Sequence, residues 1–327
     1  MTAHRLNRSR YGFGFSADAE PALLIDSGDS VVIETLDCFS NKVDSAEQRF
    51  ERDADLLSLI GRYNPVTGPI AVRGARPGDR LAVRVDRIAL GTHAPFAVTV
   101  ITGDRKGICG RQSPLLPPVP DTRICPLDGD YVLFPTHRGD LRLPVRPMIG
   151  SVGTAPAVGT ESSLEFDYRH GGNVDCPDLT VGATLTLPVN VPGGLLWLGD
   201  VHAAMGDGEI TGTALETNAD VTVTVTVLPG SDAVESDPAP WLDDAISVGS
   251  IGCEFGADLS DNLHRAFADL LDRLVAGYGL DAVEAYELLG AAGRVTVNQC
   301  VLGGWTAARA WIEKRMLPSA LPSERAG

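Results

Sequence analysis

The chain has 327 residues, 44% hydrophobic and 21% charged, so it is long enough for a substantial core and too apolar to be disordered. Its 27 Lys and Arg against 43 Asp and Glu give a formal net charge of −16. Such a surface repels phosphate backbones and anionic lipid, which argues against nucleic-acid and membrane partners. No signal peptide and no run of 18 apolar residues is visible, so we expect a cytoplasmic protein.

The first two thirds of the chain alternate apolar and polar residues with a period of two, which is typical of strands. The 36 Gly and 22 Pro supply the turns that many short strands need. The clearest strand is 221–227, where Val and Thr alternate. We predict a mainly β (α+β) fold, a β-sandwich core with C-terminal helices. The other expected strands are residues 31–35, 81–88, 97–101, 141–145 and 184–189.

A turn interrupts the apolar segment 184–199, TLTLPVNVPGGLLWLG. Its Pro and Gly residues favour a tight reversal between two strands. We therefore expect a hairpin here that brings residues 170–175 beside residues 200–209.

After residue 255 the apolar spacing becomes helical. Caps and stops divide this region. We expect a first helix with Ser260 as N-cap that ends at Gly277 or Gly279. A second helix should begin with a capping box of Asp281 and Glu284 and end at Gly293. A strand over 295–301 and a final helix over 307–316 should follow.

The polar segment 231–240, SDAVESDPAP, is the best candidate for a boundary. We expect residues 1–240 to form a β-rich sandwich region that carries a metal site, and residues 241–327 to form an α+β region packed on it, unless the two are one domain. The six Cys, at positions 38, 109, 125, 176, 253 and 300, form no CxxC pair. They indicate reduced thiols of a cytosolic protein.

Acidic residues and two of the six His are concentrated in residues 170–216. Asp200 and His202 are two apart after an apolar run, so on a strand they would share a face near its buried end. Buried charge needs a partner or a metal, and mixed imidazole and carboxylate donors suit zinc or another divalent transition metal. One Asp-x-His pair alone would be weak evidence, but a dense set of acids threaded through Gly turns favours a metal or catalytic site.

Three consecutive segments, HGGNVD (170–175), LPVNVPGGLLWLGDVHAAMGDGE (187–209) and ITGTALE (210–216), resemble the signature of the acetamidase/formamidase family. Four further segments resemble family segments in the expected order: VVIETLDCF (31–39), NPVTGPIAVRGARPGDRLAV (64–83), PMIGSVGTAPA (147–157) and AYELLGAAGRVTVNQCV (285–301). The resemblance therefore extends from about residue 20 to 315.

This resemblance implies a β-rich sandwich with added helices, a bound divalent metal with zinc favoured, and hydrolysis of a small carboxamide such as formamide or acetamide to carboxylate and ammonia. We also expect a homodimer or higher homo-oligomer. By the motifs, Asp200 and His202 would bind the metal, joined by Asp37 or Asp175. Glu209 would be the acid/base, and Asn173 and His170 would orient the amide. Asp207 and Glu216 would support the metal ligands from a second layer.

Two other classes of function stay open. One is a nucleophilic amidase that uses Cys or Ser, for which Cys176 beside Asp175 is a mild signal. The other is a non-catalytic β-sandwich that binds carbohydrate or a metal, since Asp207-Gly-Glu209 could form a calcium loop. Ammonia release from amides, and its sensitivity to chelators or thiol reagents, would separate the three.

Overall fold

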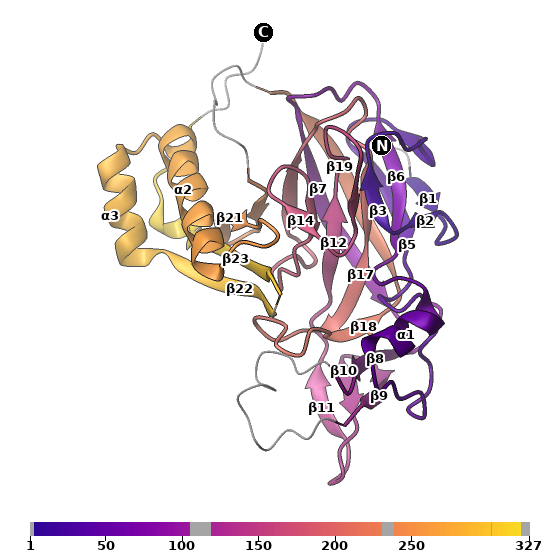
Figure 1. The fold of residues 1–327 in the computed structure, drawn as a ribbon. Coiled ribbons are helices and arrows are strands. Elements are labelled where there is room, and N and C mark those ends of the chain that lie inside the picture. The colour runs from indigo at the N-terminus through magenta and orange to yellow at the C-terminus, as the bar shows by residue number, and fades with distance from the viewer. Residues whose placement is uncertain (1–2, 105–118, 231–238, 302, 322–327) are drawn as a thin grey trace.

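Two large β-sheets form a sandwich, and the C-terminal helices lie to one side of it in the computed structural model (Figure 1). The structure describes residues 3–104, 119–230, 239–301 and 303–321. The predicted boundary at 231–240 therefore lies almost entirely outside the described residues. The β-rich fold with C-terminal helices confirms the predicted class.

The first sheet has nine strands, and the strand that the Val/Thr alternation predicts lies within it. Val221, Val223 and Val225 are buried and the Thr residues between them are partly exposed, as expected. The strand order is β1 (Ala3–Leu6), β5 (Asp29–Glu34), β19 (Ala219–Leu228), β7 (Arg80–Leu90), β16 (Thr184–Pro188), β20 (Trp241–Asp243), β21 (Ser247–Gly252), β23 (Trp305–Glu313) and β22 (Arg294–Val301).

The second sheet has twelve strands. Nine of them follow the order β11 (Leu141–Pro144), β10 (Tyr131–Phe134), β9 (Asp121–Asp128), β8 (Phe96–Ile101), β18 (Leu215–Thr217), β17 (Leu196–Ala204), β12 (Met148–Gly153), β15 (Gly171–Asn173) and β14 (Phe166–Asp167). Strand β6 (Val66–Val72) also pairs with β17, and it carries β2 (Tyr11–Gly12) and β4 (Leu23–Ile25). A separate pair joins β3 (Gly14–Ser16) to β13 (Thr160–Ser162).

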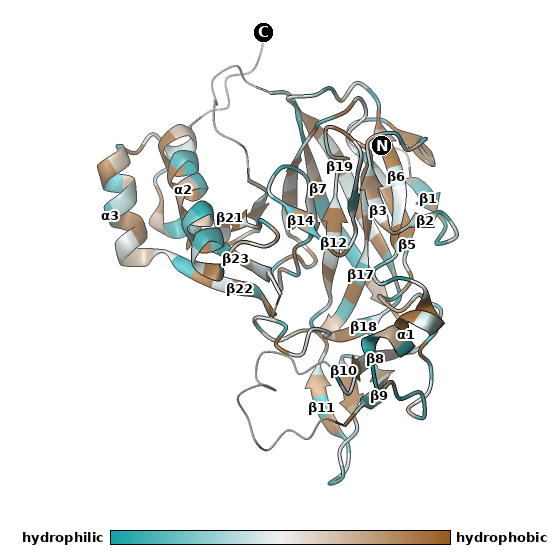
Figure 2. Ribbon diagram, in the orientation of Figure 1, coloured by the Kyte–Doolittle hydropathy of each residue, from teal (hydrophilic) through white to brown (hydrophobic). Residues whose placement is uncertain are grey.

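The main hydrophobic core draws buried side chains from both large sheets. Val31 and Leu185 come from the nine-stranded sheet, while Ile70, Ile149 and Leu198 come from the twelve-stranded one. Apolar residues accordingly concentrate on the central strands in Figure 2. Because both sheets bury one face against the other, the sandwich is a rigid support for any side chain placed where its strands end.

The predicted hairpin over residues 184–199 is wrong. Strand β16 pairs with β7 and β20 in one sheet, whereas β17 pairs with β12, β18 and β6 in the other. The Pro and Gly residues therefore mark a crossover between sheets. Both strands are buried almost throughout, so the sequence carried no polar face from which this could be read.

The C-terminal region follows the predicted helix positions but not the last element. Helix α2 (Leu259–Tyr278) starts after Asp258, two residues before the expected Ser260, and ends at Gly279. Helix α3 (Ala282–Ala292) has the predicted capping box and ends at Gly293. Residues 305–313 form a strand, and only Lys314–Met316 form a 3₁₀ turn, so the predicted helix over 307–316 is wrong.

The reason lies in the position of β23 between β21 and β22, with α2 packed over this part of the sheet. Its alanines Ala307, Ala308 and Ala310 are fully buried. Alanine favours helices in isolation, but here it fills a central strand where larger side chains would not fit. Tertiary packing has overridden local propensity.

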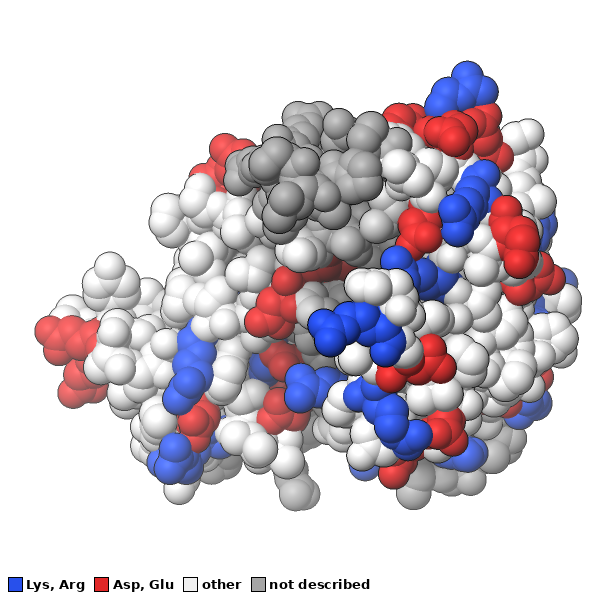
Figure 3. All heavy atoms as spheres, turned by 90° about the horizontal axis from the view of Figure 1, so that it is seen from below, with Lys and Arg blue, Asp and Glu red and all other residues white. Residues whose placement is uncertain are grey.

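The remaining surface carries both charge signs. On the face shown in Figure 3, acidic and basic side chains are interspersed. None of the helices in the described part of the chain has the length and apolarity needed to cross a bilayer. The short helix α1 (Asp53–Ile60) covers an apolar cluster of its own beside β8.

Candidate functional site

Four neighbouring strands of the twelve-stranded sheet, in the order β18, β17, β12 and β15, carry four of the nine predicted site residues: Asn173, Asp200, His202 and Glu216. His202 on β17 lies directly opposite Glu216 on β18. Ser151 on β12 lies opposite Asn173 on β15. Strand β12 therefore bridges the HGGN segment to the Asp-x-His segment, which is the role that we predicted for a hairpin.

These strands end at a cavity of about 840 Å³. Its polar lining includes Asn173, Asp175, Asp200, Glu209 and Glu216. Aliphatic and aromatic side chains also line it, namely Leu57, Tyr63, Leu164, Val301 and Trp305. A cavity that combines apolar side chains with a few convergent polar groups is the usual form of a small-molecule site.

His202 and three carboxylates that line this cavity lie close together. The Nε2 atom of His202 lies 3.2 Å from Oε2 of Glu216, 3.5 Å from Oδ1 of Asp200 and 3.8 Å from Oδ1 of Asp175. All four side chains are at most 4% exposed. Among the described residues, these ion pairs with His202 are the only ones that the three carboxylates make.

Each carboxylate is held through one oxygen and turns the other toward His202. Asp200 Oδ2 accepts hydrogen bonds from Asn64 Nδ2 (2.9 Å) and Ser151 Oγ (3.2 Å). Asp175 Oδ2 accepts one from the Gln299 side-chain amide. Glu216 Oε1 accepts one from the backbone N–H of Ala214, at 2.7 Å.

The oxygens that face His202 are poorly satisfied. Oδ1 of Asp175 and Oε2 of Glu216 have no hydrogen-bond partner within the described part of the chain, and neither have the ring nitrogens of His202. Buried polar atoms are nearly always paired, so several together need an explanation. A divalent cation between them would satisfy the two oxygens and Nε2 of His202, and imidazole with carboxylate donors fits zinc or a similar ion. The residues therefore fit the metal that the sequence predicts.

Burial and neighbouring charges shift the pKa values of Asp175, Glu216 and His202. Burial raises the pKa of Asp175 well above its usual value, and the Asp200 charge adds to this. Burial also raises the pKa of Glu216. For His202 burial acts in the opposite direction and lowers the pKa, but Glu216 and Asp200 outweigh it and hold the imidazole pKa well above its normal range. Such shifts are concentrated at functional sites.

Backbone strain occurs at the same positions. Asp175, Asp200 and Glu209 have φ values of 37°, 56° and 42°, in the left-handed region that non-glycine residues rarely adopt. Each such residue costs on the order of 1 kcal/mol and persists because the surrounding structure enforces it. Strain at three acids of one cavity wall is expected where side chains must be aimed at a common point.

Glu209 lies on the cavity wall, half-buried, in the turn after β17. One of its carboxylate oxygens belongs to a group with His202 and Glu216 whose donor atoms lie within 4.8 Å of one another. Burial and the Asp175 charge raise the pKa of Glu209. Its placement near the ligand cluster is compatible with the predicted acid/base role.

Glu216 contributes an oxygen to this cluster, although we expected it to lie behind the ligands. Asp207 is exposed on its turn, with no ion pair among the described residues.

His170 lines a separate cavity of about 270 Å³ and packs against Phe15. Burial lowers the pKa of His170 to about 4, so its ring is neutral near pH 7. His170 and Asn173, which both belong to the HGGN segment, therefore line different cavities.

The structure adds three polar residues that the sequence reasoning missed. Asn64 donates to Asp200 and to Asn173 Oδ1, each at 2.9 Å. Ser151 donates to the same Asn173 oxygen at 2.6 Å, and Gln299 holds Asp175. All three occur in segments that resemble the family, but nothing local in those segments indicates a role.

Gly150, in the segment 147–157, lies where no larger residue would fit. A Cβ atom at this position would overlap Oδ1 of Asp175 and would lie 2.6 Å from Oδ2 of Asp200. Only glycine lets the β12 backbone pass behind both carboxylates, so the glycine of PMIGSVG forms part of the cradle.

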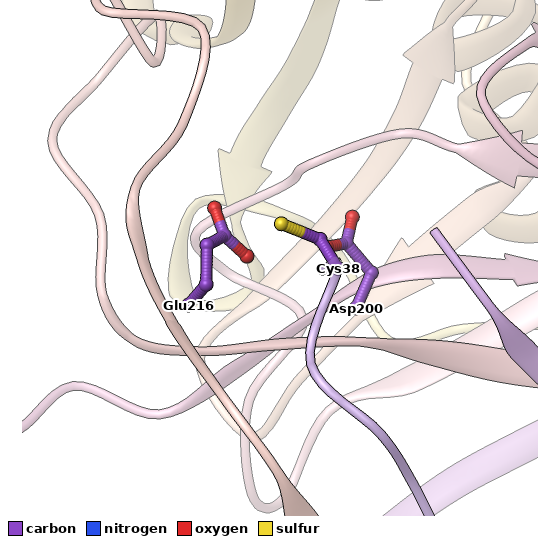
Figure 4. A group of neighbouring side chains, drawn as sticks. All are labelled: Cys38, Asp200 and Glu216. Carbon is purple, nitrogen blue, oxygen red and sulfur yellow. The ribbon is translucent and has the colours of Figure 1, made fainter. Parts of the chain in front are cut away.

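Asp37 was predicted as a possible metal ligand, but one of its carboxylate oxygens is engaged by the backbone. Its Oδ1 accepts backbone hydrogen bonds from Phe39 (2.9 Å) and Asn41 (2.7 Å), and so it closes a turn. Burial raises the pKa of Asp37 to about 7, opposed by these two bonds. The next residue, Cys38, directs its sulfur toward the carboxylate of Glu216, with Asp200 on its other side (Figure 4).

Comparison with known proteins shows a match to one family over most of the chain. The model of the acetamidase/formamidase family matches residues 8–165 and 166–301. A formamidase from Methylophilus methylotrophus is 26% identical over 235 residues, which cover 58% of this chain and just over half, 56%, of that relative.

Two solved structures are similar over nearly their whole length. An acetamidase from Bacillus halodurans has a TM-score of 0.83 and 34% identity, over 95% of this chain and 97% of that one. An acetamidase from Yersinia enterocolitica has a TM-score of 0.85 and 30% identity, over 97% and 94% of the two chains. The chain is a member of the acetamidase/formamidase family.

Proposed function

We propose that this protein is a metal-dependent amidase that hydrolyses a small linear carboxamide, such as formamide or acetamide, to a carboxylate and ammonia. Membership of the family and the names of its relatives support amide hydrolysis. The observation that carries metal dependence is the arrangement of Asp175, Asp200 and Glu216. Each is anchored through one oxygen and directs the other toward His202 in a buried wall of the cavity.

Asp175, Asp200 and His202 would hold the cation, and Glu216 is placed to join them. The residues behind them fix their orientation, as the supporting hydrogen bonds of metal sites generally do. A divalent cation held there would acidify a water molecule and polarise the amide carbonyl. Asp37, in this proposal, contributes through the turn that it closes and not through a direct bond.

Glu209 would accept the proton of the attacking water and deliver it to the leaving nitrogen. Asn173 would orient the amide: its Oδ1 is occupied by Asn64 and Ser151, which leaves its N–H groups to donate into the cavity that it lines. The water oxygen joins the acyl carbon, the C–N bond breaks, and the products are the carboxylate and ammonia. His170 would support the HGGN segment structurally from outside the cavity.

The proposal includes zinc as the metal, a homodimer or higher homo-oligomer, and the cytoplasm as the compartment. Imidazole and buried carboxylates favour zinc over calcium, which prefers an all-oxygen site. The five cysteines among the described residues are free thiols, as a reducing compartment requires. Cys109 lies outside the described residues.

The test combines metal analysis with ammonia release. Purified protein should contain a stoichiometric divalent metal and release ammonia from formamide or acetamide. Removal of the metal with a chelator should abolish turnover, and zinc should restore it. Ammonia release that survives complete metal removal would refute metal dependence, and no release from any small amide would refute the amidase assignment.

A further inference from the structure

We propose that the thiolate of Cys38 is a further ligand of the metal, so that the site binds its cation through sulfur, imidazole and carboxylate donors together. This inference rests on the metal dependence proposed above. It assigns a role to a residue for which the sequence motifs gave none, and it determines which metals the site would select.

The position of Cys38 is fixed on both sides. Cys38 lies within the turn that Asp37 closes, and the backbone N–H of Asn64 donates to the carbonyl oxygen of Cys38 at 3.0 Å. Asn64 also holds Asp200 through its side chain, at 2.9 Å. One residue therefore fixes both Cys38 and a predicted ligand relative to each other.

The sulfur atom lies among donors. Sγ of Cys38 and carboxylate oxygens of Asp200 and Glu216 lie within 4.8 Å of one another, and all three residues are buried. Figure 4 shows the thiol directed toward the Glu216 carboxylate and beside that of Asp200. Cys38 also lines the 840 Å³ cavity, so a cation at this point would be reached from the same side as the substrate.

A buried cysteine is more often a small apolar residue, and Cys38 does pack beside Phe39 and Tyr63. That interpretation does not explain its other neighbours. An apolar group beside two buried carboxylates would leave them without solvation, and Oε2 of Glu216 indeed has no hydrogen-bond partner among the described residues. A cation shared by sulfur and oxygen would satisfy this atom and would explain why the thiol points toward charge.

Thiolate coordination has a chemical consequence. The S–H proton is lost as the sulfur–metal bond forms, and it passes to solvent through the cavity, so binding releases one proton from this residue. Thiolate ligands favour zinc, cobalt and other thiophilic ions over magnesium and calcium. The site should therefore retain Zn²⁺ or Co²⁺ in the presence of a large excess of Mg²⁺.

Cobalt substitution tests the proposal directly, because a thiolate bound to Co²⁺ produces an intense charge-transfer absorption in the near ultraviolet. We expect this absorption in Co²⁺-loaded wild type and in Cys125→Ser, a matched control at a buried cysteine of another cluster. It should disappear in Cys38→Ser. Cys38→Asp, which offers oxygen in place of sulfur, should bind Co²⁺ without the absorption. Co²⁺-loaded wild type without the absorption, or Cys38→Ser with it, would overturn the proposal.

A second measurement needs no variant. Wild type treated with N-ethylmaleimide should be modified at Cys38 at least tenfold faster after metal removal than with zinc bound, as measured by peptide mass spectrometry. Equal rates would overturn the proposal. If the protein binds metal and releases ammonia but fails these tests, only the Cys38 assignment is wrong. If it binds no metal, the proposed function itself fails.

Discussion

Replacement of Glu209 by glutamine tests the central step of the proposed mechanism. Glutamine keeps the size and hydrogen-bonding shape of the side chain but cannot accept and return a proton. Glu209 lies on the cavity wall, near enough to His202 and Glu216 for their donor atoms to form one group. The change therefore removes ionisation at this point without opening a void.

The expected loss follows from the role. Positioned acid/base groups contribute about 10²–10⁴-fold to rate. At about 1.36 kcal/mol per tenfold, the activation free energy should rise by roughly 3–5 kcal/mol. The loss should fall on kcat and leave KM nearly unchanged. Bound metal should stay at the wild-type level, because Asp175 and Asp200 keep their supporting hydrogen bonds and the change does not touch His202.

The assay measures ammonia release over a range of amide concentrations, alongside metal content by mass spectrometry. Glu287→Gln, the same chemical change at an exposed position of α3, is the matched control and should behave as wild type. If metal disappears from Glu209→Gln, Glu209 is a ligand and another carboxylate is the base. If activity survives with metal in place, Glu209 is structural and the mechanism is wrong at this step.

Four further outcomes are expected. His202→Ala and Asp200→Asn should each lose bound metal and activity; full metal occupancy in both would refute the ligand assignment. Gly150→Ala should weaken metal binding at least tenfold, measured by competition with a chromophoric chelator, because its methyl group would displace two carboxylates; unchanged affinity would show that the cradle can move. Thiol titration after unfolding without reductant should find all six cysteines, and three disulfides would contradict a reducing compartment. Burial lowers the pKa of His170 from 6.5 to about 4, so between these values the unfolded chain binds a proton that the folded chain does not. The free energy of unfolding should therefore fall by up to about 3 kcal/mol as pH drops through that window, and urea denaturation of His170→Phe should lack this component; identical pH dependence would refute it.

The parts of the fold that the sequence predicted are those where a local pattern directly reports burial. The alternation at 221–227 follows the pleat of β19, and the capping box at Asp281 marks the start of α3. Residues 196–203 on β17 and 307–310 on β23 are buried without a break, so burial does not alternate along them and leaves no periodic signal. There, the neighbouring strands alone decide the structure.

The site shows the same division. Asp200 and His202 could be paired from spacing, because two residues on one strand share a face. The contributions of Asn64, Gln299 and Cys38 depend on which strands and turns lie beside β17. These three residues are between 97 and 164 residues away from Asp200 and His202 in sequence. Single side chains at such separations carry no local pattern, so only the folded arrangement reveals them.

The charges of the cluster argue that a cation completes the site. Asp175, Asp200 and Glu216 are buried around a single imidazole, whose one positive charge cannot neutralise all three. Packing carboxylates this closely destabilises the fold, and holding two of them in left-handed backbone adds to the cost. A core built for stability alone would replace them with apolar residues. Because a divalent cation would turn the same repulsion into attraction, chelation should lower the melting temperature of wild type but hardly affect Asp200→Asn, in which the metal has already been lost. An equal shift in both proteins would show that the metal is bound elsewhere.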